Sequence, residues 1–158
     1  MTTNQIGLNT KQSTNLAQEL NMLLANYQMF YQNLRGFHWN IQGPSFFELH
    51  IKFEELYNDA VMKVDEIAER ILTLGETPHH TFTAYLEHST IKEAANVKDG
   101  EGTVSTTLAN LKTLLEMERK ILDLSGEAGD EGTNSQMSDY ISQQEKTVWM
   151  LSAYLGKK

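Results

Sequence analysis

The chain has 158 residues, enough for one domain that buries its own hydrophobic core. It contains no cysteine, which excludes disulfide frameworks, thiol catalysis and iron–sulfur clusters. The formal net charge of −8 repels phosphate groups, so the folded body is expected to be a poor general nucleic-acid binder. The sequence shows no signal peptide and no stretch near the roughly 18 apolar residues of a membrane span, so we expect a cytoplasmic protein.

Residues 1–12 are polar and aperiodic, so we expect a flexible N-terminal tail ahead of one helical domain over residues 13–156. From there apolar residues recur at steps of three and four, the spacing of one helix face. Ser13 or Thr14 is the expected cap of this first helix, which is predicted to end near residues 38–39. Its apolar positions are Leu16, Leu20, Leu23, Tyr27, Phe30 and Leu34.

A second long helix is predicted after the break at Gly43-Pro44. Gly75 suits a left-handed stop at its end, and Pro78 follows. Between the break and this stop, the helical spacing is kept by Phe46, Leu49, Phe53, Leu56, Ala60, Val64, Ile67, Ile71 and Leu74.

Residues 79–101 form a connection that is expected to hold one short helix around residues 83–87. The third helix is predicted from Val104, Leu108, Leu111, Leu115, Glu118, Ile121 and Leu122. After an acidic, glycine-rich break at residues 126–132, a fourth helix is predicted from Met137, Ile141, Val148, Leu151 and Leu155. Four long amphipathic helices with one long middle connection predict an all-α four-helix bundle.

Two pairs of potential metal ligands lie on the second helix: His50 with Glu54, and Asp65 with Glu69. Residues four apart share a helix face, and Glu54 and Asp65 are about three turns apart, so both pairs lie on one stripe. His50 and Asp65 are nevertheless roughly 22 Å apart along the helix axis. The two pairs therefore cannot bind the same ion within one chain.

An antiparallel second copy of this helix, across a two-fold axis near residues 58–60, would bring the two kinds of pair together at two identical sites. His38, at the end of the first helix, would complete the histidine half. Imidazole nitrogens with several carboxylates suit Fe(II), Mn(II) or Zn(II). Each residue alone also fits a structural interpretation, with the histidines as packing residues and the acids as partners of Lys63 or Arg70.

A di-iron site buried inside one bundle would need Glu-x-x-His motifs on inward helix faces. The letters match at Glu76-Thr77-Pro78-His79, but a proline at a helix end prevents a regular helical turn there. An interior di-iron site is therefore not expected.

Several short motifs follow one another in an order typical of a known family. They are Phe37-His38-Trp39-Asn40, Gly43-Pro44, Phe46-Phe47-Glu48-Leu49-His50, Asp65-Glu66-Ile67-Ala68-Glu69-Arg70-Ile71, Leu74-Gly75-x-x-Pro78 and Glu145-Lys146-x-x-Trp149-Met150-Leu151. Together they resemble the Dps family of mini-ferritins (DNA-binding protein from starved cells). The resemblance covers nearly the whole chain and is densest over residues 34–78.

This resemblance implies a ferritin-like subunit in a hollow dodecameric shell, with dinuclear iron centres shared between two subunits. His38 and His50 match the catalytic ligands of one subunit, and Asp65 and Glu69 match those of its neighbour. Glu54 stands where the family usually has Asp, so its carboxylate is moved by one methylene but is still expected to bind metal. The implied activity is a ferroxidase that uses hydrogen peroxide preferentially, stores ferric mineral and protects DNA from oxidative damage. Zinc is an alternative occupant of one metal position.

The family lines a three-fold pore with acids near the start of the last helix, and Asp130 and Asp139 match by position. The alternative interpretation is that these acids complement a helix N-terminus. His79, His80 and His88 lie outside the family pattern.

Binding to DNA is implied less strongly, because family members that bind it often carry basic tails. Here the leading segment offers only Lys11, and the end offers Lys157-Lys158. Weak, non-specific binding and association with the nucleoid are the most we expect. A DNA-coating structural protein with incidental metal sites is the alternative function.

Overall fold

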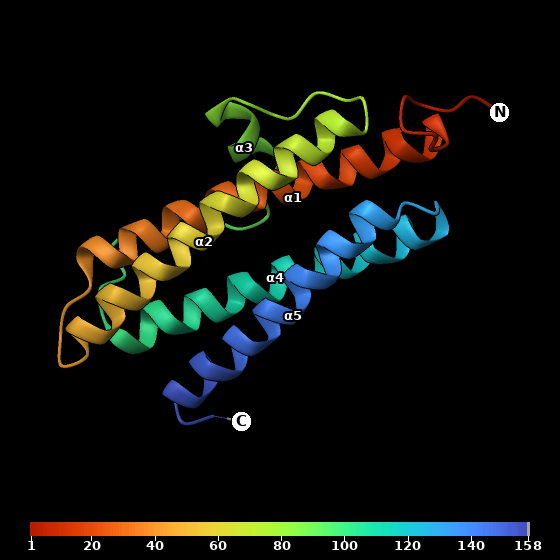
Figure 1. The fold of residues 1–158 in the computed structure, drawn as a ribbon. Helices are drawn as coiled ribbons and strands as arrows, with labels where there is room; N and C mark the ends of the chain where they lie inside the picture. The colour runs from red at the N-terminus through yellow and green to blue at the C-terminus, as the bar shows by residue number, and fades with distance from the viewer. Residues whose placement is uncertain (158) are drawn as a thin grey trace.

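The computed structural model describes residues 1–157, and over this range the chain folds into five α-helices without a β-strand (Figure 1). The helices are α1 (Thr10–Asn40), α2 (Phe46–Thr73), α3 (Phe82–His88), α4 (Gly100–Glu127) and α5 (Glu131–Tyr154). The predictions of an all-α class, four long helices and one short helix in the middle connection are confirmed. No helix within residues 1–157 is both long and apolar enough to cross a membrane.

The four long helices form two antiparallel pairs, α1 with α2 and α4 with α5, and α1 also packs along α4 (Figure 1). The connection between α2 and α4 runs the length of the bundle, and α3 within it packs on α1. One end of this connection is fixed where the Asn4 side chain donates to the Leu74 carbonyl at 3.4 Å. The other end is fixed where the N–H of Gln42 donates to the Lys98 carbonyl at 2.8 Å. The crossover leaves α2 and α4 parallel.

The first helix begins at Thr10, earlier than predicted, because Asn9 caps it. The side-chain oxygen of Asn9 accepts a hydrogen bond at 3.0 Å from the backbone N–H of Gln12. Ser13, one of the two expected caps, is buried within the first turns, and its hydroxyl accepts a hydrogen bond from Asn4 at 3.1 Å. The N-terminal segment thus folds back on the start of α1, while the flexibility of residues 1–12 stays a prediction.

The second helix ends as the sequence predicts. Gly75 has a φ of 95°, a left-handed conformation that side-chain-bearing residues adopt at a cost. The N–H of Glu76 donates to the carbonyl of Ile71 at 3.1 Å, which satisfies a carbonyl of the last turn. This stop turns the chain into the crossover connection.

A polar network crosses the core between α1, α4 and α5. The Tyr27 hydroxyl donates to the Glu118 carboxylate at 2.5 Å, and the Gln144 amide donates to the same oxygen at 3.1 Å. Burial raises the pKa of Glu118 to about 7, although these two donors oppose the shift. The apolar stripe predicted for the third long helix, which is α4, thus contains a buried, hydrogen-bonded acid.

Candidate metal centre

The two predicted histidine ligands meet where the last turn of α1 faces the first turn of α2. Nδ1 of His38 lies 2.6 Å from the carbonyl oxygen of His50, and Nδ1 of His50 lies 2.7 Å from the carbonyl oxygen of His38. The two rings are stacked, with centres 3.9 Å apart and planes 11° apart. The short turn between the helices, in which Gly43 has a φ of 110°, sets this register.

These reciprocal hydrogen bonds determine which ring nitrogen is available to a metal. A backbone carbonyl only accepts, so Nδ1 of each ring must carry the proton and donate it. The Nε2 lone pair of His38 and of His50 then stays free in the neutral ring. Fixing the tautomer and ring orientation in this way is typical of histidines that bind metals.

Two aromatic side chains hold the histidine pair in place, and the sequence analysis did not single them out for this role. Phe46 stacks on the ring of His50, with centres 5.0 Å apart. Tyr57 contacts His38 edge to face, with centres 5.3 Å apart. The signal was present for Phe46, because it lies four residues before His50 and therefore on the same helix face.

The three predicted carboxylate ligands are all exposed on α2. Glu54 lies one turn after His50, whereas Asp65 and Glu69 lie on later turns. The neighbouring Asp65 raises the pKa of Glu69, first through a side-chain hydrogen bond and then through like charge. Asp65 and Glu69 are therefore close enough to act together on one cation.

The two halves of the ligand set do not meet within the chain. Across residues 1–157, no group of three or more His, Asp or Glu side chains lies close enough to hold one ion. His50 and Asp65 sit on one continuous helix, α2, which keeps them roughly 22 Å apart along its axis. The structure therefore presents two separate candidate half-sites, one where α1 meets α2 and one on the later turns of α2.

The two predicted pore residues have different environments. Asp130 is 1% exposed. Its carboxylate caps α5 by accepting a hydrogen bond from the N–H of Thr133 at 3.0 Å, and it accepts a second one from the Arg70 guanidinium at 2.6 Å. This geometry supports the helix-capping interpretation of Asp130. Asp139 is exposed and lines a hollow of about 490 Å³ between α2 and α5, together with Glu66 and other residues. A pore lined by either residue stays a prediction.

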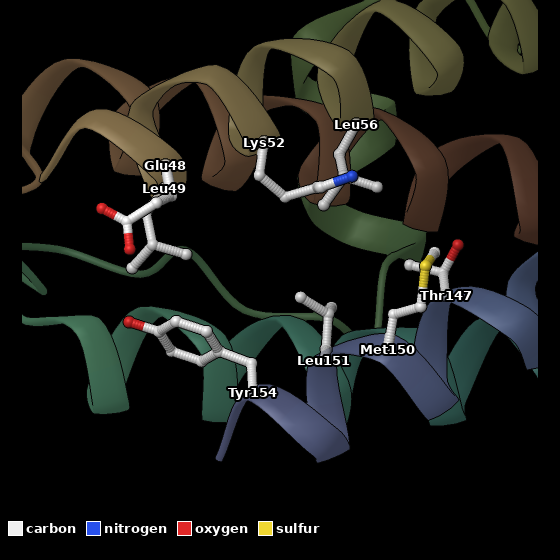
Figure 2. A pocket seen from close by; sticks show the side chains of 8 residues that line it. All are labelled: Glu48, Leu49, Lys52, Leu56, Thr147, Met150, Leu151 and Tyr154. Carbon is white, nitrogen blue, oxygen red and sulfur yellow. The ribbon is translucent and has the colours of Figure 1, made fainter. Parts of the chain in front are cut away.

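A separate cavity of about 240 Å³ lies between the first half of α2 and the last half of α5 (Figure 2). Figure 2 shows apolar side chains, among them Leu49 and Leu151, with Glu48 and Lys52 as its charged members. None of the predicted ligands lines this cavity. It therefore takes no part in the candidate metal centre.

Four long helices with a lengthwise crossover, and candidate metal-ligand half-sites on α1 and α2, are typical of the ferritin-like class of helical proteins. The model of the ferritin-like domain family matches residues 17–158. A crystal structure of the Dps protein from Vibrio cholerae O1, described as a member of a broad superfamily of ferritin-like diiron-carboxylate proteins, superimposes with a TM-score of 0.96. It is 57% identical in sequence and covers 98% of both chains.

Two further relatives refine the class. The DNA protection during starvation protein of Porphyromonas gingivalis is 44% identical over 151 residues, which is 96% of this chain and 95% of that protein. A crystal structure of a Dps protein from Bacillus brevis has a TM-score of 0.89 and 38% identity, over 94% of this chain and 99% of the other. The chain belongs to the Dps family of mini-ferritins.

Proposed function

We propose that this chain is a ferroxidase and iron-storage protein whose dinuclear centres form between two subunits of a dodecameric shell. The observation that carries the proposal is the division of the ligand set on α2. The histidine half has its Nε2 atoms freed by the reciprocal Nδ1 bonds, and the acidic half lies on a distant turn of the same helix. Neither half alone offers a full set of ligands.

The exposed stripe of α2 supports pairing of two subunits at this surface. The midpoint between the two ligand pairs falls near residues 58–60, and the apolar side chains of Val61 and Met62 lie next to it, 40% and 64% exposed. A second chain packed antiparallel across this point would cover both side chains. The same packing would place His50 and Glu54 of each chain beside Asp65 and Glu69 of the other.

Each residue has a distinct task in the proposed reaction. The Nε2 atoms of His38 and His50 would each offer a nitrogen ligand to ferrous ion, and the carboxylates of Glu54, Asp65 and Glu69 would supply the oxygen ligands. Carboxylate oxygens are hard donors and favour Fe(III), so oxidation lowers the energy of the bound product. Each Nδ1 keeps its proton and donates it to the backbone carbonyl that faces it, so the rings are held as neutral ligands.

Hydrogen peroxide is the proposed preferred oxidant because two ferrous ions supply the two electrons that its reduction to water requires. One peroxide and two protons then give two water molecules and two Fe(III), without release of hydroxyl radical. The Fe(III) moves on to mineral in the shell cavity. Zinc, which accepts the same imidazole and carboxylate ligands, would compete for one of the positions.

Iron entry and storage draw on the negative charge of the chain. Asp139, Asp59 and Glu66 line one hollow, which would concentrate cations on their way to mineral. We assign the pore contribution to Asp139, whereas both carboxylate oxygens of Asp130 are engaged with Arg70 and Thr133. Protection of DNA then follows from removal of iron and peroxide.

Direct coating of DNA is the alternative, and the charge argues against it. Twelve chains at −8 would sum to about −96 and repel phosphate. A gel shift at low salt, with and without Mg²⁺, separates the two functions. Retardation at equal strength in both conditions would favour coating, and none in either would leave oxidation as the protective activity.

Stopped-flow oxidation of Fe(II), with peroxide and with oxygen, tests the proposed function. His38→Gly combined with Asp65→Ala removes one ligand from each half and is expected to slow oxidation strongly. Size-exclusion chromatography should show that the variant still assembles, since it keeps Val61 and Met62, the exposed apolar side chains of the proposed contact. An assembled variant that oxidises Fe(II) at the wild-type rate would refute the proposed centre.

A further inference from the structure

Two histidines outside the candidate metal centre lie against each other. His79 belongs to the segment that follows α2, and His88 is the last residue of α3. Their rings meet edge to face, with centres 4.6 Å apart and planes 76° apart. Both side chains are half-buried, so part of each remains open to solvent.

The backbone around this pair is anchored on both sides. The N–H of His79 donates to the side-chain oxygen of Asn21 on α1 at 2.8 Å, and the carbonyl of His79 accepts from the Tyr85 hydroxyl at 3.0 Å. Thr81 caps α3 by accepting from the N–H of Ala84 at 3.2 Å. These bonds fix His79 relative to the helix that carries His88, so the juxtaposition is part of the fold.

The imidazole nitrogens of the pair are free for a ligand. The hydrogen bonds that the structure describes over residues 1–157 engage the backbone of His79 and neither ring. Burial lowers the pKa of His79, and the neighbouring His88 and His80 lower it further, while Glu87 opposes the shift. At neutral pH His79 is therefore uncharged, which is the form that binds metal.

We propose that His79 and His88 form a two-histidine chelate for a divalent transition-metal ion of borderline softness, distinct from the iron centre. An ion about 2.1 Å from one nitrogen of each ring would hold the ring centres roughly 4.5 to 5.5 Å apart. The observed separation of 4.6 Å falls in this range, and the rings would turn from their edge-to-face arrangement to direct one lone pair each at the ion. Water fills the other positions, because no third His, Asp or Glu within residues 1–157 completes a cluster here.

The ligand type selects the metal. Two imidazoles without a carboxylate suit Zn(II) and Cu(II) better than iron, which gains most from hard oxygen donors in its oxidised state. The open water positions make the ion exchangeable. The proposed site is independent of the iron chemistry, because it shares no residue with the half-sites on α1 and α2.

Zn²⁺ binding by the whole protein tests the site in a background that lacks one ligand from each half of the proposed iron centre. In shells carrying His38→Gly and Asp65→Ala, equilibrium dialysis should count one further Zn²⁺ per chain. His79→Gln or His88→Gln should each remove it, with at least a tenfold loss of affinity. His80→Gln is the matched control: its ring bonds the Pro78 carbonyl at 2.9 Å, and binding should persist.

Two further readouts keep the test independent of folding and of the iron centre. Cu²⁺ bound to the same background should show two nitrogen ligands by electron paramagnetic resonance, and one in either single variant. His79→Gln with His88→Gln in otherwise wild-type shells should leave the rate of Fe(II) oxidation unchanged, which shows intact folding. Equal Zn²⁺ counts with and without the pair, or loss of the ion in His80→Gln alone, would overturn the proposal.

Discussion

Two inactive variants, mixed within one shell, are expected to regain activity if the iron centre forms between chains. His38→Gly damages the histidine half of a chain and leaves its acidic half intact, whereas Asp65→Ala does the reverse. When the two variants pair across the two-fold axis, one of the two centres receives both damaged halves. The other receives the intact histidine half of one chain and the intact acidic half of the other.

The size of the recovery follows from this geometry. Random pairing of equal amounts makes about half of the dimers mixed, and each mixed dimer has one intact centre out of two. The mixed shells should therefore show about a quarter of the wild-type amplitude. Within one chain the roughly 22 Å between His50 and Asp65 along α2 rules out recovery by any rearrangement of side chains.

The assay is stopped-flow oxidation of Fe(II) by hydrogen peroxide in shells co-expressed with two different affinity tags and purified through both. A pair with both changes in the same half, His38→Gly with His50→Gly, is the matched control and should recover nothing. Recovery in this control, or no recovery from the first pair despite mixed shells, would refute the division of the centre between chains.

Three further changes probe residues whose roles differ. Because burial raises the pKa of Glu118 from 4.5 to about 7, the folded chain holds a proton that the unfolded chain releases, so stability falls as the pH rises through this window. Glu118→Gln should remove this loss, which amounts to up to about 3 kcal/mol in the free energy of unfolding. Urea unfolding at several pH values should then show a flatter pH dependence, and an unchanged dependence would contradict the role of Glu118. Asp130→Ala should lower the free energy of unfolding by about 2 kcal/mol, because α5 loses its cap and Arg70 loses its partner. Iron uptake should persist. Slow uptake with normal stability would instead indicate a pore role for Asp130. Glu54→Gln should slow Fe(II) oxidation on the order of tenfold, whereas Glu54→Asp should retain most of the rate; equal rates in both would remove Glu54 from the centre.

The helical architecture was readable from the sequence because each long helix keeps an apolar face between recognisable stops. Gly75 is an example, since a glycine followed by a proline predicts a left-handed end, and its φ of 95° shows one. The start of α1 was less predictable. Asn9 lies in a polar segment without periodicity, and its capping role depends on a hydrogen bond that Ser13 and Thr14 were equally suited to make.

The candidate ligands could be chosen from spacing, but the way in which the two histidines are held could not. The bonds between Nδ1 of one histidine and the carbonyl of the other depend on how the end of α1 crosses the start of α2, which is a tertiary property. The same reason hid the role of Glu118, an acid within an apolar stripe that is explained by Tyr27 and Gln144 from two other helices.

The proposed division of the ligands between chains would determine where Fe(II) oxidation takes place. In an isolated chain the histidines lie far from Asp65 and Glu69. Neither half then faces the other, so one chain alone cannot complete the proposed centre. In the proposed arrangement, two chains would complete two centres as they cover Val61 and Met62. Assembly and activity would then be one event, because the surface proposed for pairing also carries the proposed ligands. Fe(III) would therefore form only in assembled subunits, where an enclosed space is available to receive it.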